Sequence, residues 1–400
     1  MDFELPDDVR EFCEVTRIIV RDLLPYEIEF QETGNVPPIV RQTLVDNGYF
    51  GMALPEQYGG LGLGALAQAA VQIELARLPP QFWTELRPLM GPGAKNIMYH
   101  ASEAQREALL PGMATGEIPI AFALTEPNSG SDPGSMRTTA VRNADGWVIN
   151  GSKTFISNGK KAKYVIVYAY TDKSAGARGG ISAFLMPADT PGFSVTGTIE
   201  LMGTATPGVF ELSFDECQVG PDALIGELGR GFHYALEGLN EGRMNVGATA
   251  VGMGEYALEL AIEESKQRPA FGGVISDFQA IRHYLADMAT DMRAARLILL
   301  DAAWRYDQGE KRRELASMAK LFATEAGSRT VDTAVQIFGG TGYCRGFAVE
   351  RLYRDIRITR IYEGSSEIQR NTIARASAPL ACIWPTTCAT STASPSRQQS

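Results

Sequence analysis

The pattern of apolar residues changes twice along the chain, near residues 119 and 228, and this change limits the possible folds most strongly. The segments before and after these points indicate helices. The segment between them has short runs of β-branched and aromatic residues separated by turn signals. We therefore expect an α+β fold that is mostly α, with an N-terminal all-α domain over 1–118, a central β-domain over 119–227 and a C-terminal four-helix bundle over 228–378.

The N-terminal segment predicts a series of helices with one clear start signal. Ser102 stands at an N-cap position and Gln105 follows at the spacing of a capping box. The glycine-rich stretch 59–64 is not a dinucleotide-binding fingerprint, because no strand–helix–strand unit surrounds it. We interpret it as a connection between helices. The helices expected here cover 7–32, 37–48, 65–78, 91–100 and 102–115.

The central segment reads as a small β-domain. Turn signals of the hairpin type occur at 143–146, 150–151 and 158–159. Phe210, Leu212 and Phe214 alternate with polar neighbours, which is typical of a half-buried strand. The strands expected between and after the turns cover 147–149, 164–170, 181–186 and 209–214.

The C-terminal segment predicts long amphipathic helices. Apolar residues recur at spacings of three and four from Phe278 to Leu299, which marks one face of a helix of roughly eight turns. A second stripe runs from Leu315 to Phe338 and ends at Gly339-Gly340, as at a C-cap. Helices of this length favour a four-helix bundle, and one that can form an oligomer.

Composition excludes several classes of function. Lys and Arg number 37 against 47 Asp and Glu, and the net charge of −10 argues against a nucleic-acid partner. The five cysteines form no CxxC pair and the three histidines have no HExxH spacing, so no metal site is expected. The sequence shows neither a signal peptide nor an apolar run of about 18 residues, so we expect a cytoplasmic protein without a membrane span. The Ser-, Thr- and Pro-rich stretch 379–400 reads as a disordered or non-native tail.

Three short clusters could hold a reaction site, although each also has an ordinary structural interpretation. The cluster 123–135 offers hydroxyl groups and backbone N–H groups suited to a polar ring edge or a phosphate, or it is a turn-rich connector. In 151–159, Phe155 and Ser157 on one face of a strand could stack on an aromatic plane and bond its edge, or form a plain hairpin strand. In 362–370, Glu363 precedes a helix capped by Ser365 or Ser366. It could act as a general base, or it is a solvent-exposed carboxylate.

Taken in order, these clusters resemble the motifs of the acyl-CoA dehydrogenase family. The resemblance covers residues 1 to about 377. The first cluster is similar to the family's T-E-P-x-x-G-S-D motif and the second to its G-x-K-x-[WF]-I-[ST]-N-G stretch. Residues 268–279 match the family's R-x-x-F-G…Q motif. Residues 336–343 match its second signature, and residues 361–369 match the segment of its catalytic glutamate.

The resemblance implies a three-part fold with FAD between the β-domain and the bundle, in a homo-oligomer that is commonly a tetramer, with a dimer as the other possibility. It implies that the flavin ring is lined by Phe122, Thr125, Phe155 and Ser157, near Gly130 and Ser131. It implies further FAD contacts, some reaching a neighbouring subunit, from Arg268, Phe271, Gln279, Gln336, Gly340, Ser365 and Glu367. The implied substrate contacts are Ser131, Asn240, Arg243 and Gly364.

The same resemblance implies α,β-dehydrogenation of an acyl-CoA thioester to the trans-2-enoyl-CoA. Glu363 would take the α-proton while a hydride passes from the β-carbon to flavin N5, and an electron-transfer flavoprotein would receive the electrons. The backbone N–H of Glu363 and an FAD ribityl hydroxyl would stabilise the developing enolate. Some family members place the base directly before the bundle arginine, but this chain has Gly242 there, and Glu241 should point elsewhere.

Several residues depart from the family pattern without touching the proton-abstraction step. The aromatic residue in the second cluster is Phe155 rather than the commoner Trp, and Asn240 replaces a frequent Asp. The resemblance places Trp83 in the region that lines the acyl pocket, where its bulk argues against a long straight acyl chain. Arg87 is either a surface residue or a partner for a distal carboxylate of the acyl group. The remaining departures are Ala270, Gly346 and Glu367.

Functions of other classes share parts of this pattern. A flavin oxidase or monooxygenase on the same fold would use oxygen, and a nitroalkane-type oxidase would be expected to have Asp at 363. An inactive helical scaffold would not need Glu363 together with the full set of FAD contacts. A DNA-binding relative should have a basic surface, which the net charge disfavours.

Overall fold

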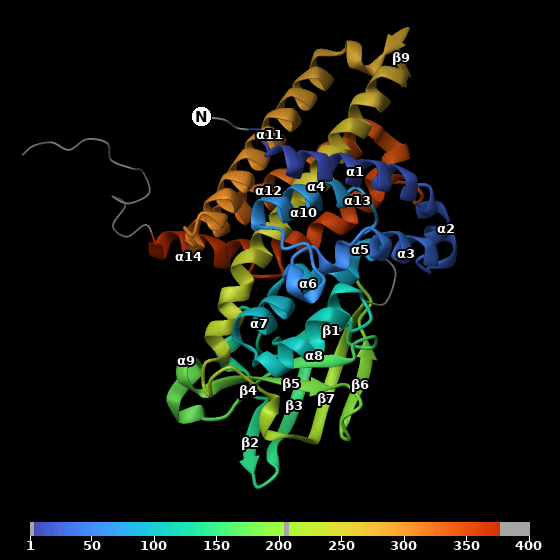
Figure 1. The fold of residues 1–400 in the computed structure, drawn as a ribbon. Coiled ribbons are helices and arrows are strands. Elements are labelled where there is room, and N and C mark those ends of the chain that lie inside the picture. The colour runs from blue at the N-terminus through green and yellow to red at the C-terminus, as the bar shows by residue number, and fades with distance from the viewer. Residues whose placement is uncertain (1–3, 204–207, 377–400) are drawn as a thin grey trace, which may run out of the picture.

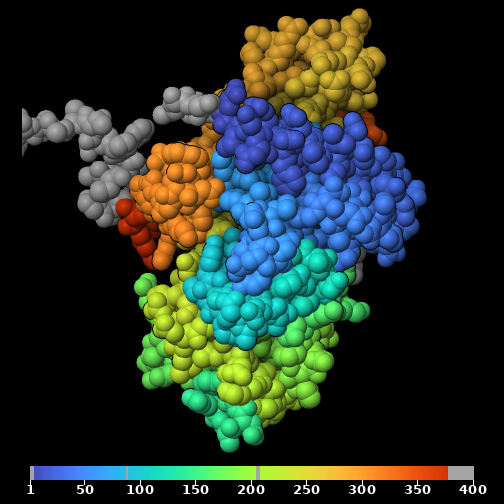
Figure 2. Space-filling model, in the orientation of Figure 1, coloured from blue at the N-terminus to red at the C-terminus, as the bar shows by residue number. Residues whose placement is uncertain are grey.

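The computed structural model describes residues 4–203 and 208–376, except for the side chains of residues 87 and 88. The molecule is elongated, with the β-domain at one end and the long C-terminal helices at the other (Figure 1). The N-terminal helices cover one side of those long helices and also reach the β-domain (Figure 2). The tail expected over 379–400 lies outside the described residues.

The N-terminal segment is helical, as predicted, but the helix expected over 7–32 is two helices. The first ends at Leu23 and the second begins at Tyr26, because Pro25 interrupts the run of helical hydrogen bonds. The capping box is confirmed: the Gln105 N–H donates to Ser102 Oγ at 3.2 Å, and the Ser102 N–H donates to Gln105 Oε1 at 2.9 Å. The helices are α1 (Asp7–Leu23), α2 (Tyr26–Thr33), α3 (Pro38–Asp46), α4 (Ala65–Leu75), α5 (Pro80–Trp83), α6 (Arg87–Met90), α7 (Pro92–His100) and α8 (Glu103–Ala114).

The central segment forms a mainly antiparallel sheet. Among the described residues the strands follow the spatial order β6-β7-β3-β2-β4-β5-β8, and β1 pairs in parallel with β4. All four expected strands occur within it. The strands are β1 (Ile120–Ala123), β2 (Thr139–Asn143), β3 (Gly146–Ser157), β4 (Tyr164–Tyr170), β5 (Ile181–Pro187), β6 (Phe193–Thr198), β7 (Val209–Val219) and β8 (Leu224–Ile225).

One of the predicted turns was wrong. Asn150-Gly151 lies inside β3, where the pairing with β7 shifts register, and it does not reverse the chain. The Asn150 side chain fills the irregularity: its Oδ1 accepts the Glu216 N–H at 2.8 Å, and its Nδ2 donates to the Glu216 carboxylate at 2.6 Å. A bulge of this kind requires the same residue types as a hairpin turn, so the local sequence does not separate the two.

The two faces of the sheet enter different cores. Along β4, Val165 and Val167 pack into the core of the β-domain itself, while Ile166 and Tyr168 face the N-terminal helices. Both faces are buried, which explains the nearly continuous apolar sequence of this strand. The β-domain is therefore packed against the N-terminal helices, and its strand β5 also contacts α10.

The C-terminal segment consists of long helices, and the predicted fold class is confirmed. The eight-turn stripe lies on α11, and α12 ends at Phe338 with Gly339 at φ 61° as its C-cap. Helices α13 and α14 pack against α12. Between the first two long helices lies a small hairpin of β9 (Pro269–Ala270) and β10 (Gly273–Val274). The helices are α10 (Gly231–Gln267), α11 (Gln279–Asp307), α12 (Arg313–Phe338), α13 (Ala348–Ile356) and α14 (Ser366–Ala376).

Within residues 4–203 and 208–376, none of the helices combines the length and the apolar character that a membrane crossing requires.

Candidate active site

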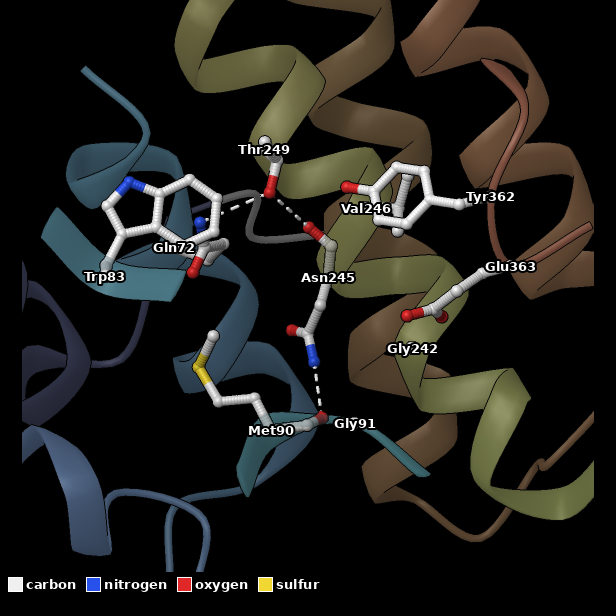
Figure 3. A pocket seen from close by; sticks show the side chains of 10 residues that line it. All are labelled: Gln72, Trp83, Met90, Gly91, Gly242, Asn245, Val246, Thr249, Tyr362 and Glu363. Atoms are coloured by element: carbon white, nitrogen blue, oxygen red, sulfur yellow. Dashed lines mark hydrogen bonds between the residues drawn. The ribbon is translucent and has the colours of Figure 1, made fainter. Parts of the chain in front are cut away.

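A narrow cavity lies where the N-terminal helices meet α10 and the loop before α14. Its volume is about 20 Å³, which is room for roughly one water molecule. Glu363 and Tyr362 line one side, and Trp83 and Gln72 line the opposite side (Figure 3). The cavity thus brings a loop carboxylate together with residues from α4, α5 and α10.

The loop that contains Glu363 has a strained backbone. Glu363 has φ 52° and Gly364 has φ 91°, so two consecutive residues lie in the left-handed region. Two side chains fasten this loop. Lys320 Nζ donates to the Gly364 carbonyl oxygen at 2.6 Å, and Gln369 Nε2 donates to the same oxygen at 2.8 Å and to the Glu363 carbonyl oxygen at 3.1 Å. These bonds hold a conformation that the backbone alone would not favour.

Positive charges surround the Glu363 carboxylate. Lys320 is fully buried, and burial lowers its pKa to about 8 against the attraction of Glu363. Burial likewise lowers the pKa of Arg243, again opposed by Glu363. Arg243 Nη1 lies 3.3 Å from Asn240 Oδ1 and 3.4 Å from Ser317 Oγ, to which it donates. The site therefore holds an acidic side chain beside two buried cations.

Gly242 on α10 provides the space for this carboxylate. A Cβ atom at position 242 would lie 2.7 Å from Glu363 Cδ and would overlap a carboxylate oxygen. The neighbouring Glu241 turns away, as expected, and its carboxylate pairs with Lys95 at 2.6 Å and accepts from the Tyr306 hydroxyl at 2.8 Å. The Glu363 carboxylate thus fills the space that a side chain at position 242, directly before Arg243, would need.

The far end of the cavity is polar and its groups are oriented by one another. Gln72 Nε2 donates to Thr249 Oγ1 at 3.2 Å, and Thr249 Oγ1 donates to the Asn245 carbonyl oxygen at 2.9 Å. Asn245 Nδ2 donates to the Met90 carbonyl oxygen at 2.6 Å. This chain, drawn in Figure 3, fixes Gln72 with its amide nitrogen toward α10.

The loop after β1 is built on a buried ion pair. Lys153 Nζ lies 2.9 Å from Glu126 Oε1, and both side chains are at most 5% exposed. The same carboxylate accepts from the backbone N–H groups of Arg137 and Thr138 and from the Thr138 hydroxyl. Burial alone would raise the pKa of Glu126, but Lys153 and these donors lower it below its ordinary value. Burial lowers the pKa of Lys153 to about 8.

This ion pair organises the surface on which the flavin was predicted to lie. The Thr154 N–H donates to the Thr125 carbonyl oxygen at 2.9 Å, which joins the two predicted clusters. Phe155 has φ 57° and is 60% exposed, between buried Thr154 and Ile156. Phe122, Thr125 and Ser157 are partly buried, and Gly130 and Ser131 are exposed. An exposed aromatic face beside hydroxyl and backbone donors fits the chemistry of an isoalloxazine ring.

The other predicted cofactor residues lie at the opposite end of the bundle. Arg268 Nη2 donates to the Phe338 carbonyl oxygen at 3.1 Å and to Thr341 Oγ1 at 2.9 Å, so the β9–β10 hairpin is tied to the end of α12. Phe271 at the hairpin tip is 98% exposed. Gln279, Gln336 and Gly340 are also exposed. Within one chain these five residues therefore lie at one end of the bundle. Phe155 and Ser157 lie at the other end of the molecule, in the β-domain (Figure 1).

The remaining predicted residues are spread around the Glu363 loop. Asn240 is buried beside Arg243, and Ser365 lies directly before α14. Exposed Glu367 has its pKa lowered by a hydrogen bond from Ser365. Arg87 begins α6, and its side chain lies outside the described residues.

Several site residues were missed by the sequence analysis. Lys320 lies on the buried face of α12 among Ala316, Ala319 and Ala323, away from the stripe of larger apolar residues, so no local pattern indicates its burial. Gln72, Asn245 and Thr249 carry no local signal, because their role depends on how α4 meets α10. In the part of the chain that the structure describes, no group of three His, Cys, Asp or Glu side chains could hold a metal ion.

Three family models match consecutive parts of the chain. They describe the N-terminal domain of acyl-CoA dehydrogenase at 6–117, the middle domain at 121–217 and the C-terminal domain at 229–378. Together they span nearly all of the described residues.

Individual relatives agree with these models. An acyl-CoA dehydrogenase of Bacillus subtilis is 40% identical over 364 residues, covering 90% of this chain and 96% of the relative. The structure of butyryl-CoA dehydrogenase from Megasphaera elsdenii matches with a TM-score of 0.89 at 37% identity, covering 94% of this chain and 100% of that one. A glutaryl-CoA dehydrogenase from Mycobacterium smegmatis in complex with FADH2 matches with a TM-score of 0.86 at 28% identity, covering 93% and 95%.

Proposed function

The chain belongs to the acyl-CoA dehydrogenase family, and on that premise we propose that Glu363 is the base that takes the α-proton of an acyl-CoA thioester. Membership makes the protein a flavoprotein oxidoreductase. The finer proposal is that the product is the trans-2-enoyl-CoA and that the electrons leave to an electron-transfer flavoprotein. The observation that supports Glu363 as the base is the position of its carboxylate, which points into the cavity across Gly242.

The residues of the chain divide the reaction between them. Arg243 and Lys320 stabilise the carboxylate form of Glu363, which must be unprotonated to act as a base. The backbone N–H of Glu363 serves as a donor to the thioester oxygen, where negative charge develops as the proton leaves. Lys320 and Gln369 bond the carbonyl oxygens of Gly364 and Glu363, which fixes the backbone that presents this N–H.

The proposed cofactor is FAD. When bound, FAD supplies a flavin ring that accepts the β-hydrogen as a hydride. Phe122, Thr125, Phe155 and Ser157 would hold the ring, and Gly130 and Ser131 lie in the same loop. Arg268 and Phe271 of the β9–β10 hairpin, with the residues beside them, would hold the part of FAD away from the flavin ring. That FAD would be bound to a second copy of the chain. The 98% exposure of Phe271 and the 88% exposure of Tyr343 support such an oligomer, because apolar surface of this extent is usually covered.

The purified protein reconstituted with FAD tests this function. We expect a yellow flavin absorption band that bleaches when a short acyl-CoA such as butyryl-CoA is added without oxygen. Rapid recovery of the band in air would instead favour an oxidase that uses oxygen. Failure to bind FAD at all would contradict the proposal, and apoprotein incubated with the same thioester is the control.

The space at Gly242 leads to a prediction about turnover. Gly242→Ala should lower kcat about 10²-fold, because the new methyl group overlaps the Glu363 carboxylate and moves the base from the reacting carbon. Steady-state kinetics with an artificial electron acceptor measures the change. Gly247→Ala on the same helix is a matched control, because its methyl group would lie 3.2 Å from the flexible end of Leu299. Equal kcat values in wild type and Gly242→Ala would contradict this role of Gly242.

A further inference from the structure

Trp83 stands between two cavities. It is 1% exposed and among the largest fully buried side chains. It lines the cavity of Glu363, at the end opposite the carboxylate (Figure 3), and it also lines a second cavity in the N-terminal helical part. Among the described residues, no other side chain borders both. The indole ring therefore forms the wall between them.

The second cavity is larger, and eight of its twelve lining residues are apolar, while Gln81 and three charged residues line the rest. Its volume is about 130 Å³, close to the roughly 150 Å³ of an apolar cavity that admits a benzene molecule. The inner wall is formed by aliphatic and aromatic side chains from α3, α5 and the segments that follow them. These wall residues are Val36, Leu44, Phe50, Phe82 and Leu86.

The outer rim of the second cavity is fastened by ion pairs. Glu85 pairs with Arg41 at 3.0 Å and with Lys161 at 2.9 Å, and Arg41 Nη2 also donates to the Gly116 carbonyl oxygen at 2.7 Å. These contacts join α3, the segment after α5 and the loop before β4. The cavity therefore has a fixed outer wall, and it does not depend on Trp83 alone for its shape.

We propose that Trp83 sets the upper limit on acyl chain length in this enzyme, so that the substrate is a short-chain acyl-CoA. This inference rests on the proposed function, because it takes the Glu363 cavity as the acyl site. A chain that starts at Glu363 is stopped by the indole, which closes the opposite end of the first cavity (Figure 3). Beyond the indole lies apolar space that the native enzyme does not offer to its substrate. Removing the indole would join the two cavities into one channel.

The test compares chain lengths in the FAD-loaded enzyme. Trp83→Ala should raise the ratio of kcat/KM for octanoyl-CoA to that for butyryl-CoA roughly 10- to 100-fold, because the four extra methylene groups gain apolar surroundings. Equilibrium binding of the two enoyl-CoA products, measured by calorimetry, should change in the same direction. Trp83→Leu leaves a smaller cavity and serves as the second variant if Trp83→Ala does not fold. It should raise the same kcat/KM ratio by a smaller factor.

Phe82→Ala is the matched control. Phe82 is also a buried aromatic residue of α5, but it lines the second cavity only. Its removal enlarges that cavity and leaves the wall in place, so the ratio should stay within about twofold of wild type.

The outcomes separate this inference from the proposed function. Wild-type enzyme that reduces its flavin with neither thioester would contradict the function itself. Wild-type enzyme active on butyryl-CoA, with an unchanged ratio in folded Trp83→Ala and Trp83→Leu, would overturn the role of Trp83 alone. An equal gain in Phe82→Ala would overturn it as well, because the gain would then come from loosening and not from removal of the wall.

Discussion

Glu363→Gln should lower turnover of a short acyl-CoA about 10³- to 10⁴-fold while the protein still folds and binds FAD. The amide has nearly the same size as the carboxylate, so it fits the space over Gly242. It cannot accept the α-proton, however, so the step that starts the reaction fails. Lys320 and Gln369 contact only backbone oxygens of this loop, so the substitution leaves the loop fastened.

Anaerobic stopped-flow spectroscopy measures this loss directly as the rate of flavin bleaching. Glu32→Gln, which changes an exposed glutamate of α2 in the same way, should bleach at the wild-type rate. The flavin spectrum and a thermal melt of Glu363→Gln establish that the cofactor and fold are intact. Bleaching at the wild-type rate in Glu363→Gln would remove this residue from its proposed role.

Lys153→Met should lower the free energy of unfolding by about 3–5 kcal/mol, the usual cost of removing one partner from a buried ion pair. Methionine occupies similar space, so little of the loss comes from a cavity. The Glu126 carboxylate would keep its bonds from Thr138 and the Arg137 N–H, but it would lose its counter-charge at a side-chain exposure of 5%. Because these bonds shape the loop beneath Phe155, FAD affinity should fall together with stability.

Urea unfolding followed by far-UV circular dichroism measures this change. Lys163→Met, at an exposed position of the same domain, should cost less than about 0.5 kcal/mol. In the double variant Glu126→Gln/Lys153→Met, the neutral amide needs no counter-charge, so part of the lost stability should return. A double variant that loses the sum of both single changes would contradict the ion-pair explanation.

The order of the helical and β-rich segments and the place of Glu363 in a loop before a helix were predictable from the sequence, because those features are local. The stripe from Phe278 to Leu299 lies on α11, and Gly339 ends α12 as a C-cap. Glu363 lies in the loop just before α14, separated from the helix by Gly364 and Ser365. Each of these follows from residues near in sequence, through helical spacing or capping chemistry.

Features that depend on distant segments were not predictable in the same way. The bulge at Asn150-Gly151 exists because Glu216 of a remote strand bonds the Asn150 side chain. The polar end of the Glu363 cavity needs Gln72 to meet Thr249, which are separated by 177 residues. Trp83 was recognised as bulky, but the space behind it comes from α3 and the segment after α5. Tertiary packing decides all three.

The overlap between Gly242 and Glu363 also bears on how such an enzyme can change over generations. Two backbone positions, one on α10 and one in the loop, compete for a single volume that only one side chain can fill. With Glu363 as the proposed base, we expect an added side chain at 242 to be harmful while glutamate stands at 363, and loss of that glutamate to leave no base while glycine stands at 242. We therefore expect strong epistasis between the two sites, so that moving the base between helix and loop requires a nearly simultaneous double change.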